Sequence, residues 1–420
     1  MEDDPIATAA GLVAAGRFDA ALRLLGPLPA DHPGRHAVLG AAHLGRKEAG
    51  AALDHLQRAA AQAPEDAATR LLLGRAHLLA ADPAAAIHVF EGLAAEFPDR
   101  PGLADALAGA YRRDARYADA IRIAEVAADP GEQLRYEQAV ALACLGDGAG
   151  ALAAFDALLA RAPHLAAAWY GSHGPALECN GLADAMERLE RAAACPRANG
   201  RYRAMLAAYD VLAGRPPRPH GRKHGHLPEA AAALRPGLAP DCRLFGLTAS
   251  LLRHALTLAR RPGLVLEFGV RRGTSTRVLA AAAGQEVHGF DSFEGLPEAW
   301  GSAPAGVLTT GRRLPELGPA VRLHPGWFDD TLPPFLAAHP GPVRFANIDC
   351  DIYSSTRTVL RALTGRIGPG TVLVFDEFIG NRSWRQDEFR AFAEFRAETG
   401  LDHRIVAVNP AGKQVAVVIV

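Results

Sequence analysis

The sequence is poor in cysteine and in aromatic residues, and it has no excess of either charge. Its five cysteines form no Cys-x-x-Cys pair, so we expect neither a disulfide framework nor a structural zinc site, and a reducing compartment is favoured. Lys and Arg number 45 against 46 Asp and Glu, which gives no basic surface of the kind that attracts nucleic acid or anionic lipid. Nucleic acid is therefore not an expected partner.

Long apolar runs are also missing. No run approaches the roughly 20 residues that cross a bilayer, and the sequence begins with acidic residues where a secretion signal would carry positive charge. We expect a cytoplasmic protein with no membrane partner. Hydrophobic residues make up 49% of the chain but aromatic residues only 6%, so the core must be largely Ala, Leu and Val, which suits closely packed helices.

The first half repeats with a period of 34 residues, which is the tetratricopeptide period. Small residues at fixed positions let paired helices approach closely, and a proline ends the second helix of each pair. The recurring positions are Gly40 and Gly74; Ala52, Ala86 and Ala120; Pro64 and Pro98. We predict an all-α solenoid of about six tetratricopeptide-like repeats over residues 1–212. Such arrays present a concave surface to a protein, a peptide or another copy of themselves.

A Gly-, Pro- and Arg-rich stretch then interrupts the repeat, and we expect residues 213–236 to be a linker. After it, short apolar runs alternate with helical stretches, which is typical of a parallel sheet covered on both faces. The sequence predicts a helix over 244–260, a helix over 278–283 and a closing antiparallel hairpin of 404–408 and 414–420. We assign residues 237–420 to an α/β domain.

The first strand of this domain, 264–266, leads into a glycine-containing turn that points to a nucleotide-type ligand. Gly269 and Gly273 permit a tight turn against a ligand, and Thr274 or Ser275 can cap the next helix. The following strand, 287–290, ends in Asp291, which can accept the hydroxyls of a ribose. An NAD-dependent enzyme is disfavoured because the dinucleotide fingerprint is missing. Glu267 instead suits a cationic cofactor that carries an amino group.

Four carboxylates follow two further strands. Asp349 and Asp351 follow the strand 343–348, and Asp376 and Glu377 follow the strand 371–375. Carboxyl ends of parallel neighbours meet at one edge of a sheet, where ligands bind. Clustered carboxylates repel one another unless a cation joins them, and a hard divalent ion would acidify a coordinated hydroxyl. The alternative is that some of them cap helices or pair with arginines, the candidates being Arg344, Arg382 and Arg385.

Five motifs occur in order over about residues 244–420. They read Glu267-Phe-Gly-Val-Arg-Arg-Gly273, Phe290-Asp-Ser-Phe-Glu-Gly-Leu-Pro297, Gly326-Trp-Phe-Asp-Asp-Thr-Leu-Pro333, Ile348-Asp-Cys-Asp-Ile-Tyr-Ser-Ser-Thr356 and Phe375-Asp-Glu-Phe378. Together they resemble the macrocin O-methyltransferase family of class I enzymes. The resemblance implies a Rossmann-like seven-stranded domain that uses S-adenosyl-L-methionine, with help from Mg²⁺, to methylate a hydroxyl of a sugar or glycosylated small molecule.

The resemblance also implies a set of site residues. The implied cofactor-binding residues are Glu267, Phe268, Gly269, Gly273, Thr274, Ser275, Asp291, Ser292, Phe293, Trp327, Phe328 and Asp349. The implied catalytic residues are Asp349, Asp351 and Asp376, and the implied metal ligands are these three with Glu377. One departure is that the family typically has Asp-Asp-Tyr where this chain has Asp376-Glu377-Phe378, and the longer glutamate side chain moves the ligating oxygen.

The sequence leaves a second hypothesis from a different class of function. The chain could be a tetratricopeptide scaffold whose methyltransferase-like domain binds cofactor without turnover. Degenerate sites normally lose glycines or acidic strand ends, and both are present here. The sequence therefore favours a methyltransferase enzyme.

Overall fold

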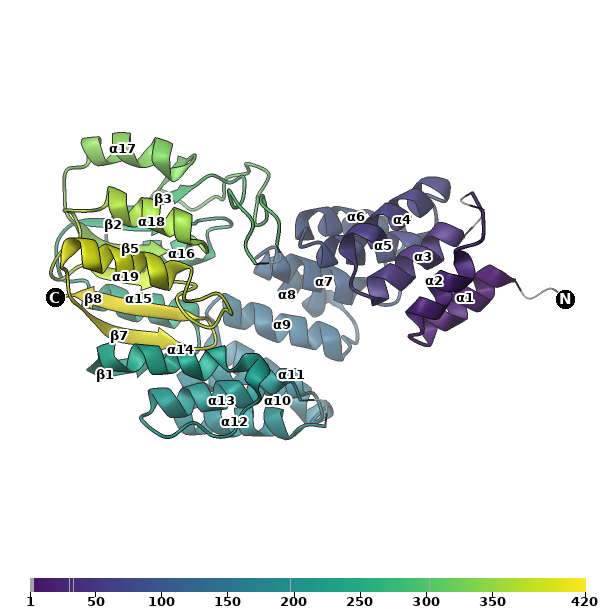
Figure 1. Cartoon of the computed structure of the whole chain (residues 1–420), viewed down its shortest axis with the longest axis horizontal. Helices are drawn as coiled ribbons and strands as arrows, with labels where there is room; N and C mark the ends of the chain where they lie inside the picture. Colours follow the sequence, from purple (N-terminus) through teal and green to yellow (C-terminus); the bar gives the residue numbers. More distant parts are fainter. Residues whose placement is uncertain (1–3, 30, 33, 197, 302) are drawn as a thin grey trace. The chain divides into compact units, whose positions relative to one another are not determined.

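The computed structural model describes residues 4–29, 31–32, 34–196, 198–301 and 303–420 (Figure 1). The chain divides into two compact units, Met1–Glu137 and Gln138–Val420. None of the helices in these described ranges is long and apolar enough to cross a membrane. In the first unit the helices are α1 (Pro5–Ala14), α2 (Phe18–Leu25), α3 (Arg35–Gly45), α4 (Ala49–Gln62), α5 (Ala67–Leu79), α6 (Pro83–Glu96), α7 (Leu103–Arg113) and α8 (Tyr117–Val126).

Each helix of the first unit packs against its neighbours in sequence, as tetratricopeptide repeats require. The predicted pairing of small and large residues is confirmed. A Cβ atom added to Gly74 would come within 2.2 Å of the Phe90 ring, and one added to Gly40 within 2.5 Å of Leu56. Ala86 is fully buried between its helices. The helices can approach this closely only because these positions lack larger side chains.

The second unit begins with further repeat helices. They are α9 (Glu132–Cys144), which contains the boundary between the units, α10 (Gly148–Arg161), α11 (Ala166–Asn180), α12 (Leu182–Ala194) and α13 (Gly200–Leu212). The boundary predicted at residue 212 thus falls inside the second compact unit. Helices α10 to α13 pack on one another in sequence order and continue the solenoid pattern.

The segment 213–236 differs from the expected linker because most of its second half is helical. It contains the 3-10 turn η1 (Arg222–His224) and helix α14 (His226–Leu234), followed by η2 (Arg235–Gly237). The run of alanines has high helix propensity, and Pro228 lies in the first turn, where proline is tolerated. Helix α14 packs between two cores, because Leu227 lies with α13 and Leu234 lies in the core of the sheet.

The sheet of the second unit has eight strands, one more than expected. Their order is β1-β7-β8-β6-β5-β2-β3-β4, and all neighbours are parallel except that β8 is antiparallel to β6 and β7. The strands are β1 (Leu238–Leu244), β2 (Leu264–Phe268), β3 (Val287–Asp291), β4 (Val321–Pro325), β5 (Val343–Ile348), β6 (Val372–Phe375), β7 (His403–Asn409) and β8 (Gln414–Ile419). The six strands that the sequence analysis placed are present, the closing hairpin included. Strand β4 beside β3 and strand β1 beside β7 were not placed from the sequence.

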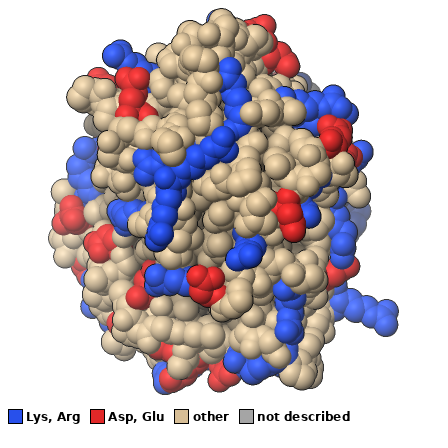
Figure 2. Space-filling model, turned by 90° about the vertical axis from the view of Figure 1, so that its left-hand side faces the viewer, with Lys and Arg blue, Asp and Glu red and all other residues tan. Residues whose placement is uncertain are grey.

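Helices cover both faces of this sheet, and alternate residues of each strand face opposite layers. One face carries α14, α17 (Phe328–Ala338), α18 (Tyr353–Ala362) and α19 (Glu388–Thr399), seen stacked in Figure 1. The other carries α15 (Thr248–Leu258) and α16 (Thr274–Ala282). The face drawn in Figure 2 carries Lys and Arg side chains interspersed with Asp and Glu side chains.

The last repeats are joined to the α/β part of the second unit by specific contacts. A carboxylate oxygen of Glu178 on α11 accepts hydrogen bonds from the amides of Gly246 (2.8 Å) and Leu247 (3.2 Å), just before α15 begins. Gly174 of α11 and Gly246 touch through their backbones, and a Cβ on Gly174 would come within 2.7 Å of the Gly246 carbonyl oxygen. The α/β part is therefore built on the repeat helices that precede it.

We expect a fragment of residues 230–420 to unfold at a lower temperature than a fragment of residues 138–420. The shorter fragment loses both hydrogen bonds of Glu178, each contributing about 1.5–3 kcal/mol because the acceptor is charged. It also begins inside α14 and so loses Leu227, which packs with α13. Thermal unfolding followed by circular dichroism gives the comparison, and Glu178→Ala in the longer fragment isolates the carboxylate. Equal unfolding temperatures would show that the repeats contribute nothing to the α/β part.

Candidate active site

Hydrogen bonds between successive strand ends place the predicted site residues side by side. The amide of Gly269 donates to the Phe290 carbonyl (2.9 Å). The amide of Asp349 donates to the carbonyl of Phe268 (2.8 Å), and the amide of Asp376 donates to that of Ile348 (3.0 Å). The parallel ladder of β3, β2, β5 and β6 thus continues one residue beyond the strands. The expectation that β5 and β6 are parallel neighbours is confirmed.

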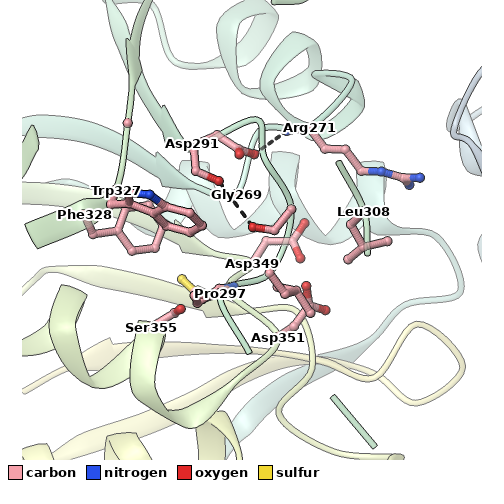
Figure 3. A pocket seen from close by; sticks show the side chains of 15 residues that line it. Gly269, Arg271, Asp291, Pro297, Leu308, Trp327, Phe328, Asp349, Asp351 and Ser355 are labelled. Carbon is pink, nitrogen blue, oxygen red and sulfur yellow. Dashed lines mark hydrogen bonds between the residues drawn. The ribbon is translucent and has the colours of Figure 1, made fainter. Parts of the chain in front are cut away.

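An open pocket lies at this carboxyl edge of the sheet (Figure 3). Trp327 and Phe328 form one side, Leu308 lies on the opposite side, and Asp349 and Asp351 lie together below. The lining residues are Gly269, Arg271, Asp291, Ser292, Gly295, Leu296, Pro297, Leu308, Gly326, Trp327, Phe328, Asp349, Cys350, Asp351 and Ser355.

Asp291 organises the turn that follows β2. One carboxylate oxygen accepts from the amides of Val270 (2.8 Å) and Arg271 (2.7 Å), and the other accepts from the amide of Phe293 (2.6 Å). Arg271 has φ of +48° and Phe293 φ of +59°, a backbone region that costs a non-glycine residue free energy. A carboxylate has about four lone-pair positions, so a single position remains for a ligand.

Gly269 and Gly273 are needed for the same turn. Gly269 has φ of +95°, and a Cβ atom there would lie 1.9 Å from the Asp349 carbonyl oxygen. Gly273, with φ of +74°, is the residue that caps α16, so the prediction that Thr274 or Ser275 caps this helix is wrong. Glycine takes the cap position because it alone adopts this conformation without steric cost.

Glu267, in β2, is completely buried and does not belong to the lining of the pocket. One carboxylate oxygen accepts from the Asn347 amide (3.0 Å), and the other has no hydrogen-bond partner among the described residues. Burial raises the pKa of Glu267, while the nearby Thr276 and Ser275 hydroxyls lower it. The oxygen that meets no donor in hydrogen-bond geometry can accept from the amino group of a cofactor, with the Thr276 and Ser275 hydroxyls close to the same carboxylate.

The other predicted cofactor residues divide into two groups. Ser292, Trp327 and Phe328 line the pocket, and Trp327 is 37% exposed. The lining does not include Phe268 or Phe293, which are buried. Phe268 stacks on Phe290 at 5.2 Å and meets Phe328 edge to face at 5.7 Å, so it supports the aromatic wall from behind. The lining also does not include Gly273, Thr274 and Ser275, which start α16.

The four predicted carboxylates share one buried region. Asp349 and Asp351 line the pocket, whereas Asp376 and Glu377 do not belong to its lining. Burial and the neighbouring Asp376 and Asp351 carboxylates raise the pKa of Asp349 well above its usual range, and burial with Glu377 and Asp376 does the same for Asp351. Burial raises the pKa of Asp376 to about 7. A carboxyl group whose pKa is raised toward neutral pH, as that of Asp376 is, suits general acid–base work.

Glu388 is a further buried carboxylate that the sequence analysis did not single out. It lies at the start of α19, is fully buried, and accepts from the amides of Cys350 (3.3 Å) and Glu377 (3.0 Å). It therefore ties the loop after β5 to the loop after β6. Burial and repulsion from Asp376 and Asp351 raise the pKa of Glu388 well above its usual range. The sequence around it looks like an exposed helix start, so no local signal marks this role.

The expected magnesium site does not fit the side chains as they are arranged. Within the described ranges, no group of three or more His, Cys, Asp or Glu side chains is placed to hold a metal ion. Glu377 instead accepts from the Lys413 ammonium at 2.9 and 2.8 Å and from Asn381, and Asp376 accepts from Gln414. Two of the arginines named as alternative partners bond elsewhere: Arg344 to backbone carbonyls and Gln285, and Arg385 to Glu229.

Comparison with known proteins agrees with both halves of this architecture. Residues 266–378 match the model of a family described as a methyltransferase domain, and residues 43–109 match that of the tetratricopeptide repeat. The chain is similar to the 8-demethyl-8-(2,3-dimethoxy-alpha-L-rhamnosyl)-tetracenomycin-C 4'-O-methyltransferase of Streptomyces olivaceus, with 34% identity over 142 residues. That alignment covers 28% of this chain and 53% of the relative, about half of its length. The chain thus carries a methyltransferase domain and tetratricopeptide repeats.

Two solved structures are similar to the chain at low sequence identity. The calicheamicin methyltransferase CalS11 is 22% identical, and the match covers 51% of this chain and 91% of that chain with a TM-score of 0.35. A tetratricopeptide repeat protein from Parabacteroides merdae is 16% identical, and the match covers 50% of this chain and 85% of that chain with a TM-score of 0.43.

Proposed function

We propose that the protein is an S-adenosyl-L-methionine-dependent O-methyltransferase that acts on a hydroxyl of a sugar or glycosylated small molecule. The observation that carries this proposal is the pocket at the carboxyl edge of the sheet, which combines an aromatic wall with paired carboxylates. The curated relative, named as a 4'-O-methyltransferase of a rhamnosyl-bearing tetracenomycin, supports the choice of acceptor class. The methyltransferase-domain match over 266–378 contains the site residues from Glu267 to Glu377.

The residues of the pocket can be divided between the parts of the cofactor. We assign the adenine to the side of Trp327 and Phe328, one ribose hydroxyl to the remaining lone pair of Asp291, and the amino group to the unpaired oxygen of Glu267. When bound, adenosylmethionine supplies the methyl group of its sulfonium. Excess carboxylate around the pocket favours this cationic donor over the neutral product.

The carboxylates Asp349 and Asp351 then face the acceptor hydroxyl. We assign Asp351 to take the hydroxyl proton as the O–CH₃ bond forms and the S–CH₃ bond breaks, with the sulfur keeping the bonding electron pair. An in-line displacement mainly requires alignment of donor and acceptor together with removal of this proton. Asp351 has φ of +62°, which its short side chain tolerates, so the turn directs this residue into the pocket.

The competing function is a scaffold with an inactive methyltransferase-like domain. The intact turn glycines and the paired carboxylates of the pocket favour an enzyme instead.

For the repeats, we infer that they bind a protein, a peptide or a second copy of the chain. Five free cysteines favour a reducing compartment, so we place the reaction in the cytoplasm.

A turnover assay with the full chain tests the proposal. Adenosylhomocysteine formation is measured with a panel of nucleotide sugars, glycosides and phenols, each with added Mg²⁺ and with chelator. We expect turnover with at least one glycoside and none with simple phenols. Cofactor binding without turnover on any acceptor would favour the scaffold, and turnover on phenols alone would contradict the acceptor class.

Asp291→Asn is expected to weaken adenosylmethionine binding about 10- to 150-fold. The change removes the charge from the bond to the ribose and loosens the turn after β2, at about 1.5–3 kcal/mol for a hydrogen bond to a charged group. Isothermal titration calorimetry gives the dissociation constant. The matched control is Asp330→Asn, an exposed carboxylate in the first turn of α17. An unchanged affinity in a folded Asp291 variant would place the ribose elsewhere.

A further inference from the structure

Lys413 brings an ammonium group to the acidic edge of the sheet. Its nitrogen donates to both oxygens of Glu377, at 2.9 and 2.8 Å, and the two side chains are 26% and 11% exposed. This is the position in the fold where the sequence resemblance placed a metal ion between the ends of β5 and β6. The positive charge found there belongs to the chain itself.

The local backbone holds Lys413 in this place. The residue closes the turn between β7 and β8 with φ of +65°, and its carbonyl accepts from the Ile379 amide (3.2 Å). Its aliphatic stem lies on Gly380, where an added Cβ atom would come within 2.9 Å of the lysine Cγ. The β7–β8 turn and the loop after β6 therefore hold this residue, so the ammonium is not the end of a freely moving surface side chain.

The neighbouring donors complete the same arrangement. Gln414, the next residue, donates to Asp376, and Asn381 donates to Glu377. A carboxylate must direct a lone pair at an ion to bind it, and these donors already use lone pairs of Asp376 and Glu377, two of the four predicted ligands. Lysine is also an unusual choice of basic residue in this chain, because only three of the 45 basic residues are lysines, at 47, 223 and 413. An ammonium is a compact point charge, closer to a metal ion in shape than a planar guanidinium.

We propose that Lys413 is the resident cation of this site and replaces the divalent metal ion. It holds Glu377 and compensates part of the negative charge beside Asp351 and Asp376, so that turnover needs no added metal. Lys413 is thus a positioning residue, because it acts through Glu377 and does not touch the acceptor. The prediction that turnover needs no added metal rests on the proposed function. The prediction that the wild type binds no divalent metal ion at this place does not rest on it.

Binding of Mn²⁺ to the chelator-treated full chain tests the proposal without any turnover. Electron paramagnetic resonance of free Mn²⁺ is compared for the wild type, Lys413→Met, Lys413→Arg and the matched control Lys223→Met, which removes an exposed lysine. We expect Lys413→Met alone to bind Mn²⁺ at least about 10-fold more tightly than the wild type, and the further change Glu377→Gln to abolish this gain. A purely structural role of Lys413 would not produce a metal site.

Turnover supplies the second readout. The wild type should keep its rate within about twofold in chelator, whereas Lys413→Met should lose about 10²-fold and recover with Mg²⁺. Tight Mn²⁺ binding by the wild type, or a chelator-sensitive wild type restored by Mg²⁺, overturns the proposal even if Lys413→Met does not fold. A folded Lys413→Met that binds no Mn²⁺ overturns it as well. If no acceptor is methylated at all, the proposed function fails while the Mn²⁺ experiment still decides the role of Lys413.

Discussion

Asp351→Asn is expected to lower kcat by about 10²- to 10⁴-fold and to leave the dissociation constant for adenosylmethionine within about twofold. Asparagine keeps the shape of the side chain but cannot take the proton of the acceptor hydroxyl. The cofactor contacts assigned to Glu267, Asp291 and the aromatic wall lie on other strand ends, so cofactor binding should survive. Single-turnover kinetics and calorimetry separate the two quantities.

The pH dependence of kcat tests separately whether Asp351 is the general base. Burial and the Glu377 and Asp376 carboxylates raise the pKa of Asp351, and a general base works only when ionised, so kcat should rise as the pH increases. Asp376→Asn removes one of the repelling charges and should shift this rise to lower pH. A pH profile unchanged by Asp376→Asn, together with full activity of Asp351→Asn, would contradict the assignment of Asp351 as the base.

Glu388→Ala is expected to reduce the free energy of unfolding by about 2–6 kcal/mol, because it leaves two buried backbone amides without an acceptor at about 1–3 kcal/mol each. Removing a carboxyl group from an acidic region also relieves repulsion, which acts in the opposite direction. Burial and the Asp376 and Asp351 carboxylates raise the pKa of Glu388, which disfavours its charged form and so reduces the repulsion that the substitution can relieve. The loss of hydrogen bonds should dominate.

Glu388→Gln separates shape from hydrogen bonding. Its amide oxygen can accept from one of the two backbone amides, while its NH₂ group cannot accept from the other, so an intermediate stability is expected. The matched control is Glu398→Ala on the same helix, whose ion pair with Arg361 (3.5 Å) is half exposed and contributes about 0–1 kcal/mol. Denaturant titration ranks the variants. Equal stability of Glu388→Ala and Glu398→Ala would show that the two loops do not depend on Glu388.

The sequence predicts the strand ends better than the contacts made there. Periodicity and motif order predict which residues follow β2, β3, β5 and β6, because a parallel sheet places these ends at one edge. Pairing across distant segments is harder to predict. Glu388 reaches the loops after β5 and β6 from a helix start without a distinctive motif, and Lys413 reaches Glu377 from the far hairpin.

Asp291 shows a second limit of what the sequence can predict about the site. Its position after β3 predicts a residue that binds a ribose, and the structure places it in the pocket. Most of its hydrogen-bonding capacity nevertheless goes to the backbone of Val270, Arg271 and Phe293. A sequence motif marks which residue is needed and does not say whether it serves the ligand or the turn. Helix α14 and strand β1 were missed because both lie in a stretch with several prolines and glycines.

Strand β1 has a consequence for the hairpin that carries Lys413. By pairing with β7, it makes β7 an interior strand, while β8 is already enclosed between β7 and β6. Local opening of the β7–β8 turn must therefore break ladder hydrogen bonds on both sides of the hairpin. The free energy of this opening is therefore closer to that of global unfolding than to that of fraying at a sheet edge. The ammonium of Lys413 is attached to one of the last parts of the sheet to open.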